Sequence, residues 1–157
     1  MYFWNTKALA HELSSNTLDK KHYKNYYLVT ALLVSVVYYY GMYSPYGDVR
    51  VIGIEGLLTL LIMFIGIQSA YKANGGDEGE HFLGRITALS FPILVQTTVA
   101  GVVFAAVLLG LYFAFNLEGT AFDDWYEWTI SLFTIFLQIL FFTRLVSYMK
   151  RVKAHTI

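Results

Sequence analysis

Apolar residues along the chain gather in four long blocks, separated by short polar segments. The four runs are Tyr26–Tyr43, Val51–Tyr71, Ile86–Phe115 and Trp128–Tyr148. Each is close to, or longer than, the roughly 18–20 residues that cross a bilayer core as a helix. A membrane β-barrel would instead need alternation over segments of about ten residues, which the runs lack. Since backbone groups in lipid must be satisfied internally, the pattern predicts four transmembrane helices.

The predicted fold class is all-α: a polytopic membrane protein with a four-transmembrane-helix bundle and short interfacial helices. An N-terminal arm over 1–25, with its own interfacial helix, precedes a transmembrane domain over 26–148 and a basic tail over 149–157. We expect spans over about 26–44, 51–71, 92–115 and 127–148.

The third apolar run is longer than one span requires, and Pro92 lies early in it. Proline removes one helix hydrogen bond and clashes with the preceding turn. We therefore divide the run into an interfacial helix over about 77–90 and a spanning helix that starts near Pro92. A single kinked and tilted helix is the alternative.

Composition agrees with a membrane protein: 57% of the 157 residues are apolar and only 14% are charged, where soluble domains carry about 25% charged residues. The chain has no cysteine, which excludes disulfides, thiolate nucleophiles and cysteine-based metal sites. A long polar lead precedes the first apolar run, and no small-residue cleavage motif follows it, which argues against a cleaved signal peptide. Net charge is zero, with no basic tract suited to nucleic acid.

The basic residues are distributed unequally between the two sides of the predicted membrane domain. Ten fall in the N-terminal arm, the middle loop and the C-terminal end, and only Arg50 falls on the other side. The ten are Lys7, Lys20, Lys21, Lys24, Lys72, Arg85, Arg144, Lys150, Arg151 and Lys153. Because cytoplasmic loops carry the excess of lysine and arginine, both termini are predicted to be cytoplasmic.

The segment from Asn74 to Arg85, NGGDEGEHFLGR, has the densest polar chemistry in the chain. Asp77 followed three residues later by Glu80 resembles a capping box that starts a helix. On that helix Glu78, His81 and Arg85 would share one face, which meets either water or a cytoplasmic partner. A metal site is disfavoured, because the chain has no second Glu-x-x-His pair to complete a carboxylate-bridged centre. We expect no metal and no cofactor.

Polar residues inside the predicted spans are candidates for a pore lining or for contacts between helices. They are Glu55, Gln96, Thr97, Thr98 and Gln138. Intramembrane charge is costly and suggests function, but Glu55 lies near the outer end of its span, where an interfacial role is the alternative. For the amides and hydroxyls, hydrogen bonding between helices competes with a hydrophilic stripe along a pore.

Two further groups bear on assembly. Small residues at helical spacing let helix backbones approach closely, within the bundle or between subunits; they are Gly101, Ala105, Ala106, Gly110 and Ala114. The last outer loop is acidic and lacks basic residues. Repeated around a symmetry axis, its carboxylates would form an outer mouth that concentrates cations; they are Glu118, Asp123, Asp124 and Glu127.

No nucleophile, base and orienting group can be assembled in one cavity, so the sequence predicts a protein that is not an enzyme. We expect an integral membrane protein of the bacterial inner membrane that works by homo-oligomerisation and by binding a cytoplasmic protein partner. An oligomeric ion channel is the alternative, and a lipid-binding or scramblase-like role is a third. In general type, though not in any motif, the chain resembles small bacterial inner-membrane proteins that include components of immunity and phage-defence systems.

Overall fold

The secondary structure that we describe is entirely helical. The computed structural model describes residues 2–15, 17–18, 20–42, 48–79, 81–115 and 120–154, with the backbone alone at 20, 36–42 and 120–124. The helices are α1 (Thr6–Ser14), α2 (Lys20–Met42), α3 (Val49–Asn74), the short 3-10 helix η1 (Gly76–Glu78), α4 (Phe82–Phe115) and α5 (Thr120–Ala154). Within these residues the all-α prediction is confirmed.

Among the described residues, three helices are long and apolar enough to cross a membrane: α3, α4 and the part of α5 from Trp125 to Ala154. These agree with a multi-pass membrane protein. The predicted span over 26–44 is not among them, so a bundle of four spans is not confirmed. It corresponds to α2, whose 23 residues include polar Asn25 and a series of tyrosines that lower its mean hydropathy.

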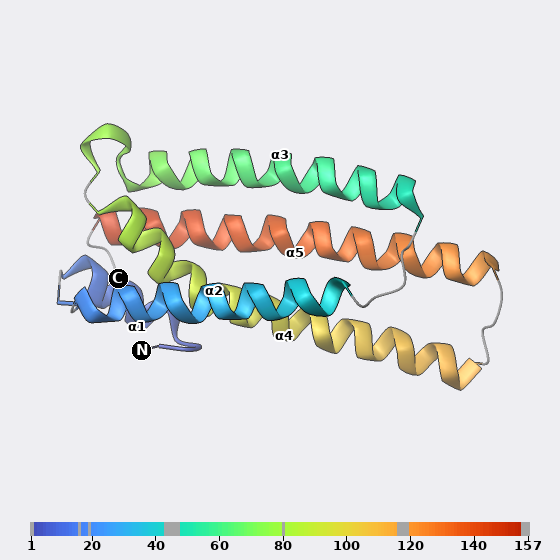
Figure 1. Ribbon diagram of the computed structural model, residues 1–157. Coiled ribbons are helices and arrows are strands. Elements are labelled where there is room, and N and C mark those ends of the chain that lie inside the picture. The colour runs from blue at the N-terminus through green and yellow to red at the C-terminus, as the bar shows by residue number, and fades with distance from the viewer. Residues whose placement is uncertain are drawn as a thin grey trace.

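The four long helices lie side by side in an open row (Figure 1). Along the row α3 packs on α5, α5 on α4, and α4 on α2, while no contact joins α2 to α3 among the described residues. The short helix α1 packs on α4 and α5. It lies at the same end of the molecule as η1 and the C-terminal end of α5 (Figure 1). Helix α3 also touches α4. The described contacts therefore leave α2 and α3 as the two outermost helices, with α1 attached at one end.

The helix α3 has well-defined ends. The Asp48 side chain accepts a hydrogen bond from the Arg50 backbone N–H at 2.8 Å, which caps the first turn. At the other end Gly75 adopts a left-handed conformation with φ 116°. This is the usual glycine termination of a helix, because a side chain is disfavoured there. With these two ends, α3 is a few residues longer at each end than the predicted span over 51–71.

The helix α4 corrects the predicted division at Pro92. It runs unbroken from Phe82 to Phe115 with Pro92 inside it, so there is no separate interfacial helix over 77–90. Pro92 is buried together with Leu89, Phe91 and Ile93, and this packing holds the turn despite the lost hydrogen bond. Figure 1 shows α4 changing direction after its first turns, as a proline kink does.

The helix α5 also extends beyond its predicted span of 127–148, from Thr120 to Ala154. Much of the predicted tail over 149–157 is therefore helical. The basic residues Lys150, Arg151 and Lys153 therefore lie on the last turns of α5.

Burial is concentrated at the end of the row where α1 lies. The buried apolar cluster draws on every long helix and on α1: Leu9, Ala10, Leu13, Tyr26, Ala70, Ala73, Ala88, Leu89, Phe91, Ile93, Leu145, Met149 and Val152. Toward the other end, large apolar side chains such as Leu57, Phe64, Val102 and Phe113 are exposed. Exposed apolar surface of this extent marks a membrane or protein contact.

Candidate functional site

The N-terminal arm is fastened to the helices by hydrogen bonds and aromatic contacts as well as by α1. The Gln96 side-chain amide donates to the Trp4 carbonyl oxygen at 2.6 Å. The Tyr2 backbone N–H donates to the Tyr26 hydroxyl at 2.7 Å, and the Phe3 and Phe91 rings meet edge to face. The arm was expected to lie on the leaflet, whereas its helix buries Leu9 and Leu13 against the bundle.

The Tyr2 hydroxyl donates to the Glu12 carboxylate at 2.7 Å, within the arm itself. This hydrogen bond raises the pKa of Tyr2 above its usual value of 10.0, because the neutral phenol is the donor; partial burial and the Glu12 charge act in the same direction. The arm is thus held in shape by a contact that needs a protonated tyrosine.

Of the five candidate pore-lining residues, Thr97, Thr98 and Gln138 line one cavity between α4 and α5, whereas Gln96 and Glu55 do not. Gln96 reaches the N-terminal arm, whereas the Gln138 amide donates to the Thr59 hydroxyl of α3 at 3.0 Å. The Thr97 hydroxyl donates to carbonyl oxygens of its own helix. Thr98 faces the space between α4 and α5, and Glu55 is half-buried on α3.

The carboxylates of the candidate acidic mouth lie largely outside the described residues. Glu118 is beyond them, and Asp123 and Asp124 belong to the part of α5 described by its backbone alone. Glu127 is described, and its side chain accepts a hydrogen bond from the Asp48 backbone N–H at 2.9 Å. It therefore links the outer end of α5 to the start of α3.

Some of the small residues on α4 pack against α5, and the others are exposed. A side chain added at Gly101 would touch Leu137 of α5 at 3.4 Å, whereas one added at Gly110 would meet nothing within 4 Å. Ala105 is partly buried, but Ala106 and Ala114 are exposed. Only the inner part of the stripe packs within this chain.

The connection between α3 and α4 differs from the predicted capped helix. Asp77 accepts a hydrogen bond from the Tyr71 hydroxyl instead of capping α4, and its predicted capping partner Glu80 lies outside the described residues. Glu78 lies in η1 and His81 precedes α4 with φ 51°. Arg85 is buried.

The expected shared face of Glu78, His81 and Arg85 therefore does not form. Arg85 instead donates to the Asn74 side-chain oxygen at 3.1 Å and joins the end of α3 to the start of α4. The sequence shows an arginine soon after a short polar connection, but it does not show that this arginine is buried. Its partner could not be identified without the path of the chain.

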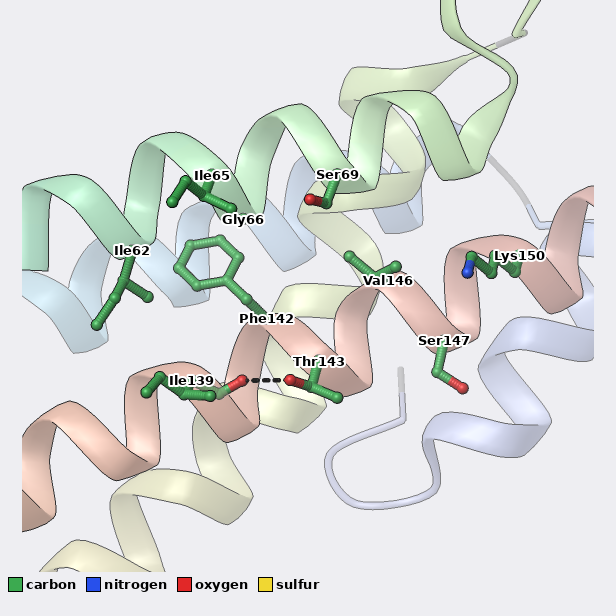
Figure 2. A pocket seen from close by; sticks show the side chains of 10 residues that line it. All are labelled: Ile62, Ile65, Gly66, Ser69, Ile139, Phe142, Thr143, Val146, Ser147 and Lys150. Carbon is green, nitrogen blue, oxygen red and sulfur yellow. Dashed lines mark hydrogen bonds between the residues drawn. The ribbon is translucent and has the colours of Figure 1, made fainter.

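Two open cavities flank α5 within the membrane-spanning region. The first, of about 530 Å³, lies between α3 and α5 (Figure 2) and is lined by Ile62, Ile65, Gly66, Ser69, Ile139, Phe142, Thr143, Val146, Ser147 and Lys150. The second, of about 570 Å³, lies between α4 and α5 and includes Thr97, Thr98, Gly101 and Gln138 in its lining. Both fall within the size range of small-molecule sites.

The Phe142 ring lines both cavities. It packs directly on Gly66, where any side chain would overlap it. In Figure 2 the ring points from α5 toward α3, beside Ile65 and Gly66. Gly66 therefore sets how closely α3 approaches α5 and shapes the first cavity.

The sequence analysis missed the polar end of the first cavity, formed by Ser69, Ser147 and Lys150. The available signal was spacing, since Thr143, Ser147 and Lys150 recur at i, i+4 and i+7 and share one face of a helix. Among the described residues, no group of three or more potential metal ligands gathers. No protein-family model, curated protein or solved structure matches the chain.

Proposed function

We propose that the chain is a four-span inner-membrane protein, with both termini in the cytoplasm, that works by assembly and not by catalysis. In this proposal α2 is the fourth span. The distribution of ten basic residues against one supports the orientation. Helix α1, the connection between α3 and α4 that contains η1, and the C-terminal end of α5 lie at one end of the molecule, as a shared cytoplasmic side requires (Figure 1).

The observation that carries self-association is the open row of helices. A bundle that closes on itself pairs its first and last helices, but here α2 and α3 are the two edges and do not touch within the described part of the chain. Many of their exposed side chains are apolar, including Leu32 on α2 and Leu57 on α3. Joining an edge of one copy to an edge of another is the simplest way to complete the packing.

Cytoplasmic partner binding is the second part of the proposal. Lys7 on α1 and Lys24 on α2 are exposed at the same end as the exposed Lys153 of α5. A rigid surface with several lysines favours an acidic partner. The buried Arg85 contributes structure to this end and not binding.

Cysteine cross-linking tests the edges, since the natural chain has no cysteine to interfere. Leu32→Cys and Leu57→Cys each place one thiol on an edge helix, and Leu132→Cys places one on the exposed face of the central α5. In native membranes we expect oxidised dimers from an edge variant and none from Leu132→Cys. A monomeric mass in native-lipid nanodiscs, together with no edge cross-link, would overturn the proposal.

The oligomeric channel has weaker support, because two of its five candidate lining residues, Gln96 and Glu55, lie outside the cavity that the other three line. The cavity between α4 and α5 does carry Thr98 and Gln138, but the Gln138 amide is engaged by Thr59. Recordings from the reconstituted oligomer would decide between the two functions. A conductance that Gln138→Leu alters, without a change in oligomeric mass, would favour the channel.

A further inference from the structure

The cavity between α3 and α5 is apolar along most of its length and polar at one end. Ile62, Ile65 and Phe142 line its apolar part. Ser69, Ser147 and Lys150 line the end that lies toward the connection between α3 and α4 (Figure 2). The cavity is open on one side, so a molecule in the surrounding bilayer has lateral access to it.

The two serine hydroxyls at this end differ from those of Thr97 and Thr143, which bond to their own helices. Thr143 donates to the Ile139 carbonyl oxygen at 2.7 Å, and Thr97 bonds back to its own helix in the same way. For Ser69 and Ser147 no hydrogen bond to another described residue is found. Ser147 is exposed and Ser69 is half-buried, so both hydroxyls are accessible to a polar group of a ligand.

Positive charge continues from the polar end of the cavity. Lys72 lies three residues beyond Ser69 on α3, and Lys153 lies three residues beyond Lys150 on α5, so each follows the cavity along its own helix. All three lysines are exposed, and none forms an ion pair with a described carboxylate. The site therefore offers ammonium groups and hydroxyls to an anion.

We propose that this cavity binds an anionic phospholipid of the cytoplasmic leaflet, with its phosphate at Ser69, Ser147 and Lys150 and one acyl chain along Ile62, Ile65 and Phe142. The depth fits, since Ile62 lies seven residues above Ser69, about 10 Å along the helix, within one leaflet of a core about 30 Å thick. Basic pockets between spans on the cytoplasmic side bind acidic headgroups. The inference rests on the membrane orientation proposed above.

Native mass spectrometry of the detergent-solubilised chain tests the site. Incubation with equal amounts of phosphatidylglycerol and phosphatidylcholine of identical acyl chains should leave about one phosphatidylglycerol per chain. Lys150→Gln should weaken this retention about fivefold, the effect of removing one lysine near an anionic headgroup. Arg151→Gln is the matched control, because it removes the same charge from the next residue, whose guanidinium lies over the Tyr148 ring.

A second pair of variants tests the acyl part without changing charge. Ile65→Trp fills the cavity at an exposed position, and Ile54→Trp makes the same exchange on α3 outside it. Only the first should lower lipid retention. Equal retention of both lipids, equal losses in Lys150→Gln and Arg151→Gln, or displacement of the lipid by millimolar inorganic phosphate would overturn the proposal.

The same spectra report oligomeric mass, so the two proposals can fail separately. Oligomers that lack the lipid preference would leave self-association standing and remove the lipid site. A lipid-selective monomer would do the reverse.

Discussion

Removing the buried leucines of α1 should release the N-terminal arm from the bundle. Leu9 and Leu13 are 0% and 1% exposed, against 77% for Leu83 on α4. A buried Leu→Ala substitution costs about 2–5 kcal/mol, so the two together cost roughly 4–10 kcal/mol. The two hydrogen bonds from the arm to α2 and α4 contribute only about 0.5–1.5 kcal/mol each. They are too weak to hold the arm alone.

Hydrogen exchange measured by mass spectrometry on peptides covering 2–15 reports this release directly. In Leu9→Ala a loss of 2 kcal/mol would speed exchange of the α1 amides about 30-fold, and the double variant should lose protection entirely. Peptides from the outer half of α3 should not change. Leu83→Ala is the control at an exposed position. If Leu9→Ala and Leu83→Ala exchanged alike, the buried cluster would not be what holds α1.

Three further predictions concern single contacts. Gly66→Ala should lower the free energy of unfolding by about 1–3 kcal/mol, because the added methyl group overlaps the Phe142 ring. Adding Phe142→Leu to this variant should restore part of the loss. Unfolding in detergent mixtures measures both effects. Gln138→Leu and Thr59→Val should show a coupling near 0.6 kcal/mol in a double-mutant cycle, and additive effects would refute the hydrogen bond. Because the pKa of Tyr2 is raised, its contribution is complete below pH 10 and is lost as pH rises further. The protection factor of the α1 amides, which is the intrinsic exchange rate divided by the observed rate at the same pH, should therefore fall above pH 10 in the wild type but not in Tyr2→Phe.

The sequence predicted the helical class and the approximate extent of the apolar helices, because hydrophobic blocks of this length have few other structures open to them in lipid. It failed at 77–90, where two local signals pointed the wrong way. Pro92 was taken as a boundary, but the buried neighbours Leu89 and Phe91 hold the helix through it. Asp77 was taken as a cap, but the hydroxyl of Tyr71, six residues earlier, donates a hydrogen bond to its carboxylate.

The contacts between helices could not be predicted, because they depend on the register of one helix against another. The Asp48 backbone N–H donates to the Glu127 carboxylate, and the Gln138 amide donates to the Thr59 hydroxyl. In both hydrogen bonds the partners are 79 residues apart in the sequence. This constant separation means that α3 and α5 run parallel in one register. No local pattern specifies that offset, which comes from how Gly66 admits the Phe142 ring. The cavity with its serines and lysine follows from the same offset.

The inner half of α5 has two faces with separable roles. Leu145, Met149 and Val152 recur at i, i+4 and i+7 and are buried in the cluster that holds α1. Ile139, Thr143, Val146 and Lys150 recur at a similar spacing and line the cavity on α3. Because the two sets occupy different faces of one helix, a variant such as Lys150→Gln should weaken the proposed lipid binding while α1 stays docked. Loss of α1 protection in that variant would mean that the cavity and the buried cluster form one cooperative unit.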